Sequence, residues 1–161
     1  ALKASGVRPR RTIRFALFTG EEQGLFGSQY YVMRHLQQMP MYQAVLVLDN
    51  GTGRIVGLPL QGRDDLHDVW TNLMKPLAAL GPIPVRSGSK GGTDHLPFLQ
   101  ARVPAFNYDQ QSRGYDYTHH SQIDVLSQAV SGDVQQAAIV MAVNALQLSN
   151  LDRRLRRDAT P

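Results

Sequence analysis

The sequence contains no cysteine, and no apolar run in it approaches the ~18 residues of a membrane span. The absence of cysteine excludes disulfides, thiolate nucleophiles and cysteine-ligated zinc. Charged residues make up 19% of the chain and hydrophobic residues 42%, which excludes an intrinsically disordered chain. A length of 161 residues suits one domain with a sizeable core.

The net charge of +4 at pH 7 belongs to the two ends of the chain. The first 14 residues carry +5 and the last 12 carry +2, so the 135 residues between them carry −3. A nucleic-acid-binding domain concentrates positive charge on its folded body. We therefore expect solvated, arginine-rich flanks and no nucleic-acid partner.

Hydrophobic periodicity predicts strands that alternate with helices. Short apolar or β-branched runs predict strands at residues 12–19, 44–48 and 103–108, and an extended segment at 54–60. Helical spacing predicts helices at residues 22–38, 64–80, 93–100 and 132–150. This alternation is typical of an α/β layered domain with a largely parallel sheet.

Acidic residues and histidines follow the predicted strands. Glu21 and Glu22 follow the first strand, and Asp49 follows the second. His119 and His120 close the loop after the third. Ligands bind at the carboxyl ends of parallel strands, and zinc accepts carboxylate oxygens and imidazole nitrogens. The sequence therefore predicts a metal site at this edge of the sheet.

Each of these residues also has a purely structural interpretation. The Glu pair could face a helix N-terminus, residues 49–51 could form a tight turn, and the two histidines could lie on a loop surface. Asp94 could cap a helix, or it could orient a ligand or substrate group beside the metal. The convergence of several such residues on one edge favours the metal site.

Five segments together resemble the co-catalytic zinc aminopeptidases and glutamate carboxypeptidases of metallopeptidase family 28. The most specific is residues 11–28 (RTIRFALFTGEEQGLFGS). The others follow in the family's order, at residues 48–49 (LD), 92–98 (GTDHLPF), 103–105 (VPA) and 120–124 (HSQID). The pair His119-His120 and residues 49–53 (DNGTG) resemble the plasma glutamate carboxypeptidase branch.

The resemblance implies a three-layer α/β/α fold with a mostly parallel, mixed sheet, and a role for each site residue. Glu21 would be the general base that takes a proton from the water held by two zinc ions. Glu22 and His120 would ligate one zinc, and Asp49 the other. Asp94 would lie near the metals. The implied substrate is a peptide, and the implied location is secreted or periplasmic.

One part of the family's pattern is missing from this sequence. The family's first zinc-binding His and its bridging Asp precede the Glu-Glu motif, whereas residues 1–20 contain neither residue type. Residues 1–6 also resemble the end of a helix stopped by Gly6. We therefore expect residues 1–161 to be the carboxyl-terminal part of a single zinc-peptidase catalytic domain, incomplete on its N-terminal side. Alone, it should bind zinc weakly, turn over no substrate and self-associate through its uncovered surface.

Three functions are compatible with these residues. The first is a zinc exopeptidase, either an aminopeptidase or a dipeptidase. The second is an acyltransferase like glutaminyl cyclase, which uses a single zinc. The third is a non-enzymatic domain that keeps the peptidase fold. Retention of Glu21, Glu22, Asp49 and His120 argues against the third.

Overall fold

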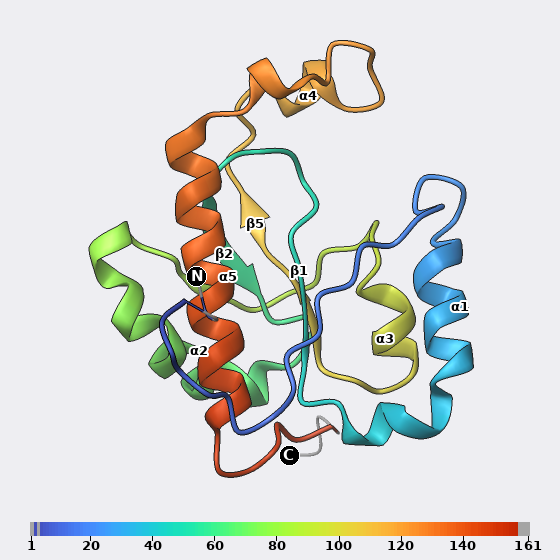
Figure 1. Ribbon diagram of the computed structural model, residues 1–161, viewed down its shortest axis with the longest axis vertical. Helices are drawn as coiled ribbons and strands as arrows, with labels where there is room; N and C mark the ends of the chain where they lie inside the picture. The colour runs from blue at the N-terminus through green and yellow to red at the C-terminus, as the bar shows by residue number, and fades with distance from the viewer. Residues whose placement is uncertain (1, 3, 158–161) are drawn as a thin grey trace.

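The computed structural model describes residue 2 and residues 4–157, which form an α/β domain (Figure 1). The strands are β1 (Val45–Val47), β2 (Ile55–Pro59), β3 (Val85–Arg86), β4 (Ala105–Asn107) and β5 (Asp109–Gln110). The α-helices are α1 (Phe26–Arg34), α2 (His67–Met74), α3 (Leu96–Gln100), α4 (Tyr115–Thr118) and α5 (Ser131–Asn150). Four 3-10 helices lie between them: η1 (Leu36–Met41), η2 (Asp64–Leu66), η3 (Lys75–Leu80) and η4 (Leu126–Gln128).

The sheet is mixed. Strand β1 pairs in parallel with β4, and β2 pairs in parallel with β3 and antiparallel with β5. Only Tyr108 separates β4 from β5, and its N–H continues the ladder to the carbonyl oxygen of Val47 at 3.1 Å. The strands thus form a two-stranded sheet of β1 and β4 and a three-stranded sheet in the order β3, β2, β5, and the two sheets join at Tyr108 into one layer.

Helices cover both faces of this layer. Successive side chains of a strand point to opposite faces, so Phe106 enters the larger core with α2 and α5. Its neighbour Ala105 enters the smaller core with Val32 of α1 and Phe98 of α3. Trp70 anchors the larger core and packs edge-on against Phe106, with ring centroids 4.8 Å apart. The predicted α/β class, with its three layers, is confirmed. None of the described helices is long and apolar enough to cross a membrane.

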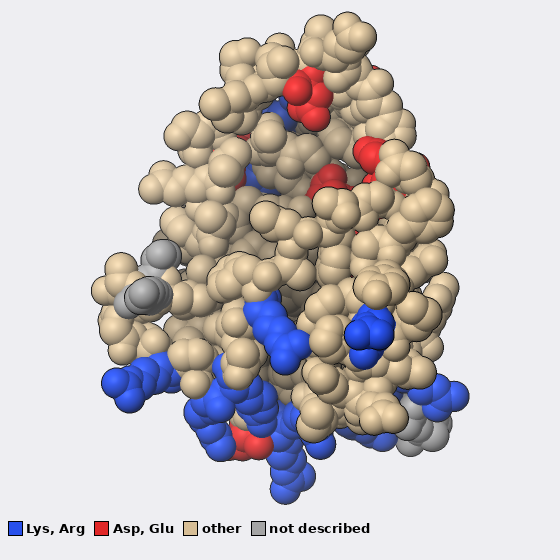
Figure 2. All heavy atoms as spheres, turned by 45° about the vertical axis from the view of Figure 1, so that its right-hand side comes forward, with Lys and Arg blue, Asp and Glu red and all other residues tan. Residues whose placement is uncertain are grey.

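The arginine-rich flanks are bonded to the body. Arg157 donates hydrogen bonds to the carbonyl oxygens of Met39 and Tyr42, at 2.8 and 2.6 Å. At the other flank, Arg11 donates to the carbonyl oxygen of Ser149 at 2.9 Å. Most arginines of the flanks are exposed to solvent, as expected, but Arg11 and Arg157 are half-buried because their guanidinium groups also satisfy backbone carbonyl groups of the body. Figure 2 shows most of the visible Lys and Arg at this end, with an acidic side chain among them, and most of the visible Asp and Glu toward the end that carries α4.

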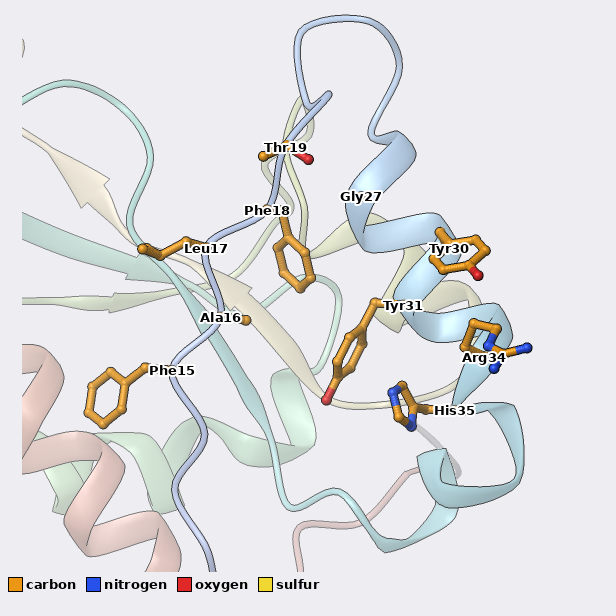
Figure 3. A pocket seen from close by; sticks show the side chains of 10 residues that line it. All are labelled: Phe15, Ala16, Leu17, Phe18, Thr19, Gly27, Tyr30, Tyr31, Arg34 and His35. Carbon is orange, nitrogen blue, oxygen red and sulfur yellow. The ribbon is translucent and has the colours of Figure 1, made fainter.

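The predicted strand at residues 12–19 is wrong. The segment forms no strand, and Phe15 and Leu17 are 86% and 99% exposed. Both side chains point away from α1, whereas Phe18 points toward Tyr31, with ring centroids 5.7 Å apart (Figure 3). This segment and α1 line a groove of about 620 Å³. A strand requires a hydrogen-bonding neighbour, and no described strand pairs with these residues.

The predicted helices lie where helices are found, but several of their boundaries differ from those of the structure. Helix α5 is confirmed almost to the residue, whereas the helix expected from residue 22 begins only at Phe26. The helix expected at residues 64–80 divides into η2, α2 and η3, and Pro76 lies in the last of these. The predicted helix end at residues 1–6 falls partly outside the described residues.

Candidate functional site

Four carboxylates gather at one edge of the layer. Glu21 and Glu22 lie in the turn before α1, Asp49 lies two residues after β1, and Asp94 lies just before α3. Burial raises the pKa of Glu21 most, and the neighbouring charges of Asp49, Glu22 and Asp94 raise it further, whereas His120 lowers it. The structure therefore brings all five residues within electrostatic reach of one another.

A glycine-rich turn holds the Glu pair. Gly20 and Gly24 have φ values of +72° and +119°, which favour glycine. The N–H groups of Gly24 and Leu25 both donate to the carbonyl oxygen of Glu21, at 3.0 and 2.8 Å. The Glu pair thus precedes α1 and lies outside its first turn. The structural interpretation, in which the Glu pair faces this helix N-terminus, therefore stays open beside the metal-site interpretation.

Glu22 and His120 are in direct contact. Glu22 Oε2 lies 2.5 Å from His120 Nε2, although 98 residues separate them in sequence. Both side chains remain more than half exposed, at 58% and 59%. His120 has a φ of +55°, a left-handed conformation that is uncommon for residues other than glycine. With this backbone conformation, the imidazole of His120 points toward the turn that carries Glu21 and Glu22.

Gln110 makes three of the hydrogen bonds that hold the turn after Asp49, and Asn107 Nδ2 donates a further one to Asn50 Oδ1 at 3.3 Å. Gln110 Oε1 accepts a hydrogen bond from the N–H of Asn50 at 2.9 Å. Gln110 Nε2 donates to the carbonyl oxygens of Gly51 and Gly53, at 2.7 and 3.0 Å. Among residues 49–53 the chain bends at Asn50 and Thr52 without a backbone hydrogen bond that closes a tight turn, and Gln110 on β5 holds this bent segment beside the acidic edge.

Asp94 has an unused oxygen. Its Oδ1 is buried without a hydrogen-bond partner among the described residues, and no side chain caps α3. Helix capping by Asp94 is therefore wrong. The next residue, His95, is fully buried, and its Nε2 lies 2.7 Å from the carbonyl oxygen of Lys90. Burial lowers the pKa of His95, which keeps its imidazole neutral.

The carboxylates and the imidazole at this edge are groups that bind divalent metals, and one pair of them lies close to the spacing that a metal requires. Several carboxylates repel one another here, and a cation would relieve this repulsion and give Asp94 Oδ1 a partner. Two ligands of a tetrahedral zinc lie roughly 3.3 Å apart, so Glu22 and His120 need to separate by less than ~1 Å to share one. Among the described residues, no group of three His, Asp or Glu side chains is already placed to hold a metal.

Two residues that shape this edge, Gln110 and Tyr115, were not placed in the site from the sequence. Gln110 lies on a two-residue strand, and nothing in its local pattern marks it as a contact of Asn50. Tyr115 contacts Gly51 and stacks on His119 with ring centroids 4.8 Å apart. The one available signal was its place in an aromatic and histidine cluster at residues 115–120.

Comparison with known proteins gives consistent results. The family described as peptidase family M28 matches residues 1–145. Carboxypeptidase Q of Mus musculus is 33% identical over 156 residues, which cover 97% of this chain and 33% of that protein. The chain thus spans about one third of the length of the curated relatives it matches.

Solved structures resemble the fold. A peptidase M28 precursor from Shewanella amazonensis superposes with a TM-score of 0.84 at 28% identity, over 93% of this chain and 34% of that one. BSAP, a zinc aminopeptidase from Bacillus subtilis, superposes with a TM-score of 0.72 at 21% identity. That superposition covers 97% of this chain and 40% of the aminopeptidase, and at this identity it shows the fold alone.

Proposed function

The chain belongs to peptidase family M28, and on that premise we propose that it forms part of a zinc-dependent exopeptidase. Residues 1–161 would be the carboxyl-terminal part of one catalytic domain, as the order of the motifs implies. The substrate would be a peptide, hydrolysed as by an aminopeptidase or dipeptidase. A secreted or periplasmic location stays a prediction of the resemblance.

The observation that carries this proposal is the contact between Glu22 and His120. A carboxylate and an imidazole from distant segments meet at 2.5 Å, and Glu21 lies beside them. Glu22 and His120 would hold one zinc, and Asp49 would hold the second. Asp94, with its unused oxygen, would orient a ligand or a substrate group near the metals.

Zinc, when bound, would polarise the peptide carbonyl and make the attacking water more acidic. Glu21 would take the proton of this water on a carboxylate oxygen and pass it to the leaving amine. Glu22 and His120 would have no part in proton transfer, because both would be occupied as ligands. This division of roles between adjacent glutamates requires that their carboxylates point differently, which the tight turn at Gly20 and Gly24 allows.

Residues 1–161 alone would not turn over peptide. In the described residues a single ligand pair is in contact, and no third donor is in position to hold a metal. A shared pair of metals requires further ligands than these. We accordingly propose weak zinc binding and no hydrolysis for this chain alone, and self-association through exposed apolar side chains such as Phe15 and Leu17.

Calorimetric titration of the 161-residue chain with Zn²⁺ tests the ligand assignment. Glu22→Gln and His120→Asn should each weaken binding by at least ~10-fold, because even residues that only orient a ligand contribute 10- to 100-fold. Glu21→Gln should retain the affinity. His67→Asn, which removes a half-exposed imidazole on α2, is the matched control. Equal affinities in all four variants would contradict the proposed metal site.

A further inference from the structure

Tyr115 bridges the two loops that carry candidate ligands. On one side its ring lies against Gly51 in the turn after Asp49. A Cβ added to Gly51 would come within 2.8 Å of Tyr115 Cδ2, so the backbone and the ring are in close contact. This turn is itself held by the three hydrogen bonds of Gln110.

On its other side, Tyr115 begins a stack that ends at Glu22 and His120, the candidate ligand pair. Its ring centroid lies 4.8 Å from that of His119, with an interplanar angle of 32°. The rings of His119 and His120 stack at 3.8 Å and 26°. His120 in turn contacts Glu22. The contacts thus run from the Asp49 turn through three rings to the Glu-bearing turn.

Among the described residues, few contacts other than this stack attach residues 113–120 to the rest of the molecule. Helix α4 has four residues, buries none of them and lies at the outer end of the molecule (Figure 1). One ion pair anchors its start to α5, between Arg113 Nε and Asp133 Oδ2 at 2.6 Å. His120 is more than half exposed and adopts a left-handed backbone conformation. The position of its imidazole therefore depends on its contact with Glu22 at one end and on the stack at the other.

We infer that Tyr115 is a positioning residue, which sets the place of His120 relative to Asp49 by stacking through His119 against the Gly51 turn. The expected effect on Zn²⁺ binding rests on the proposed function, because it requires His120 to be a metal ligand. An aromatic pair contributes enough to change an equilibrium by a factor of about 2 to 10. Loss of the Tyr115 ring should thus weaken Zn²⁺ binding by about 2- to 10-fold.

Nuclear magnetic resonance of the histidine rings in the 161-residue chain tests the stack without metal. Tyr115→Leu keeps an apolar side chain of moderate size and removes the ring, so the ring signals of His119 and His120 should both shift. Tyr115→Phe keeps the ring and should leave them unchanged. Tyr117→Ala is the matched control, because Tyr117 lies on the same helix and is 77% exposed.

The outcomes separate this inference from the proposed function. Unchanged His120 signals in Tyr115→Leu, or an equal shift in Tyr115→Phe, would overturn the positioning role. A shift in Tyr115→Leu alone, with 2- to 10-fold weaker Zn²⁺ binding that Tyr115→Phe restores, would support it. If Zn²⁺ leaves the His120 signals of the unmodified chain unchanged, the proposed metal site fails. The metal-free ring signals would still decide whether the stack exists.

Discussion

Gln136 on α5 should be among the polar side chains on which stability depends most. Its Nε2 donates to the carbonyl oxygen of Ile55 at 3.0 Å, and its Oε1 accepts from the N–H of Ile55 at 2.9 Å. The amide of Gln136 thus replaces a strand partner at the start of β2, where the pairing with β5 is irregular. Both groups of Ile55 are buried, and so is Gln136.

The substitution Gln136→Leu should lower the free energy of unfolding by about 2–4 kcal/mol. Leucine leaves two buried backbone groups without partners, at about 1–3 kcal/mol each, and burial of its apolar side chain offsets up to about 2 kcal/mol of that cost. For a domain of this size, the melting temperature should fall by roughly 5–15 °C. Gln135→Leu is the matched control, because Gln135 is exposed on the same helix, and its effect should stay within about 0.5 kcal/mol.

Urea unfolding followed by the fluorescence of Trp70 would measure both variants, since Trp70 is buried in the core next to α5. The slope of the transition should be unchanged, because the same surface is exposed on unfolding. If Gln136→Leu and Gln135→Leu unfold within about 0.5 kcal/mol of each other, the argument from unsatisfied backbone groups is refuted.

Four further predictions concern the site and its surroundings. In a full-length protein with the proposed activity, Glu21→Gln should lower kcat by ~10² or more at nearly unchanged zinc content; loss of zinc would mean that the roles of Glu21 and Glu22 are exchanged. The purified 161-residue chain should not hydrolyse an aminoacyl anilide with added zinc, and steady hydrolysis abolished by a chelator would contradict this. Because burial lowers the pKa of His95, the unfolded state binds its proton more readily, so stability should fall as pH drops through about 6.5. His95→Gln should flatten that dependence in thermal melts at several pH values, and an unchanged profile would argue against a neutral buried His95. Finally, Gly53→Ala would place a Cβ 1.8 Å from the carbonyl oxygen of Gln111, so it should cost more than about 2 kcal/mol in a denaturant titration. Gly91→Ala, which meets open space, should cost less than about 1 kcal/mol, and equal costs would show that the loop yields freely.

Much of the fold was predictable because the spacing of apolar residues along the chain indicates which residues are buried and in which kind of element. Strand β1 lies inside the predicted segment 44–48, and α5 matches the predicted helix, since both have continuous apolar or helical periodicity. Residues 12–19 show the limit of that reasoning. Their pattern is that of a buried strand, yet Leu17 is almost fully exposed, because a strand also needs a neighbour that the pattern does not reveal.

The candidate site was predictable in its residues but not in its contacts. Their placement after apolar segments indicated that Glu21, Glu22, Asp49 and His120 share one edge, and the structure brings them there. The capping alternative for Asp94 was settled only by the absence of a side-chain cap on α3. Zinc ligation by these residues stays a prediction.

The sequence by itself determined the places of β1, β2, β4 and the longer helices, the family and the chemical types available at the site, because these depend on residues that are neighbours in the chain. Only the tertiary structure decided which of them meet. Glu22 reaches His120 across 98 residues, and Gln110 reaches Asn50 across 60. Tyr115 contacts Gly51 in the same way. Such contacts depend on how the connections cross the layer, and no local preference for helix, strand or turn encodes that path.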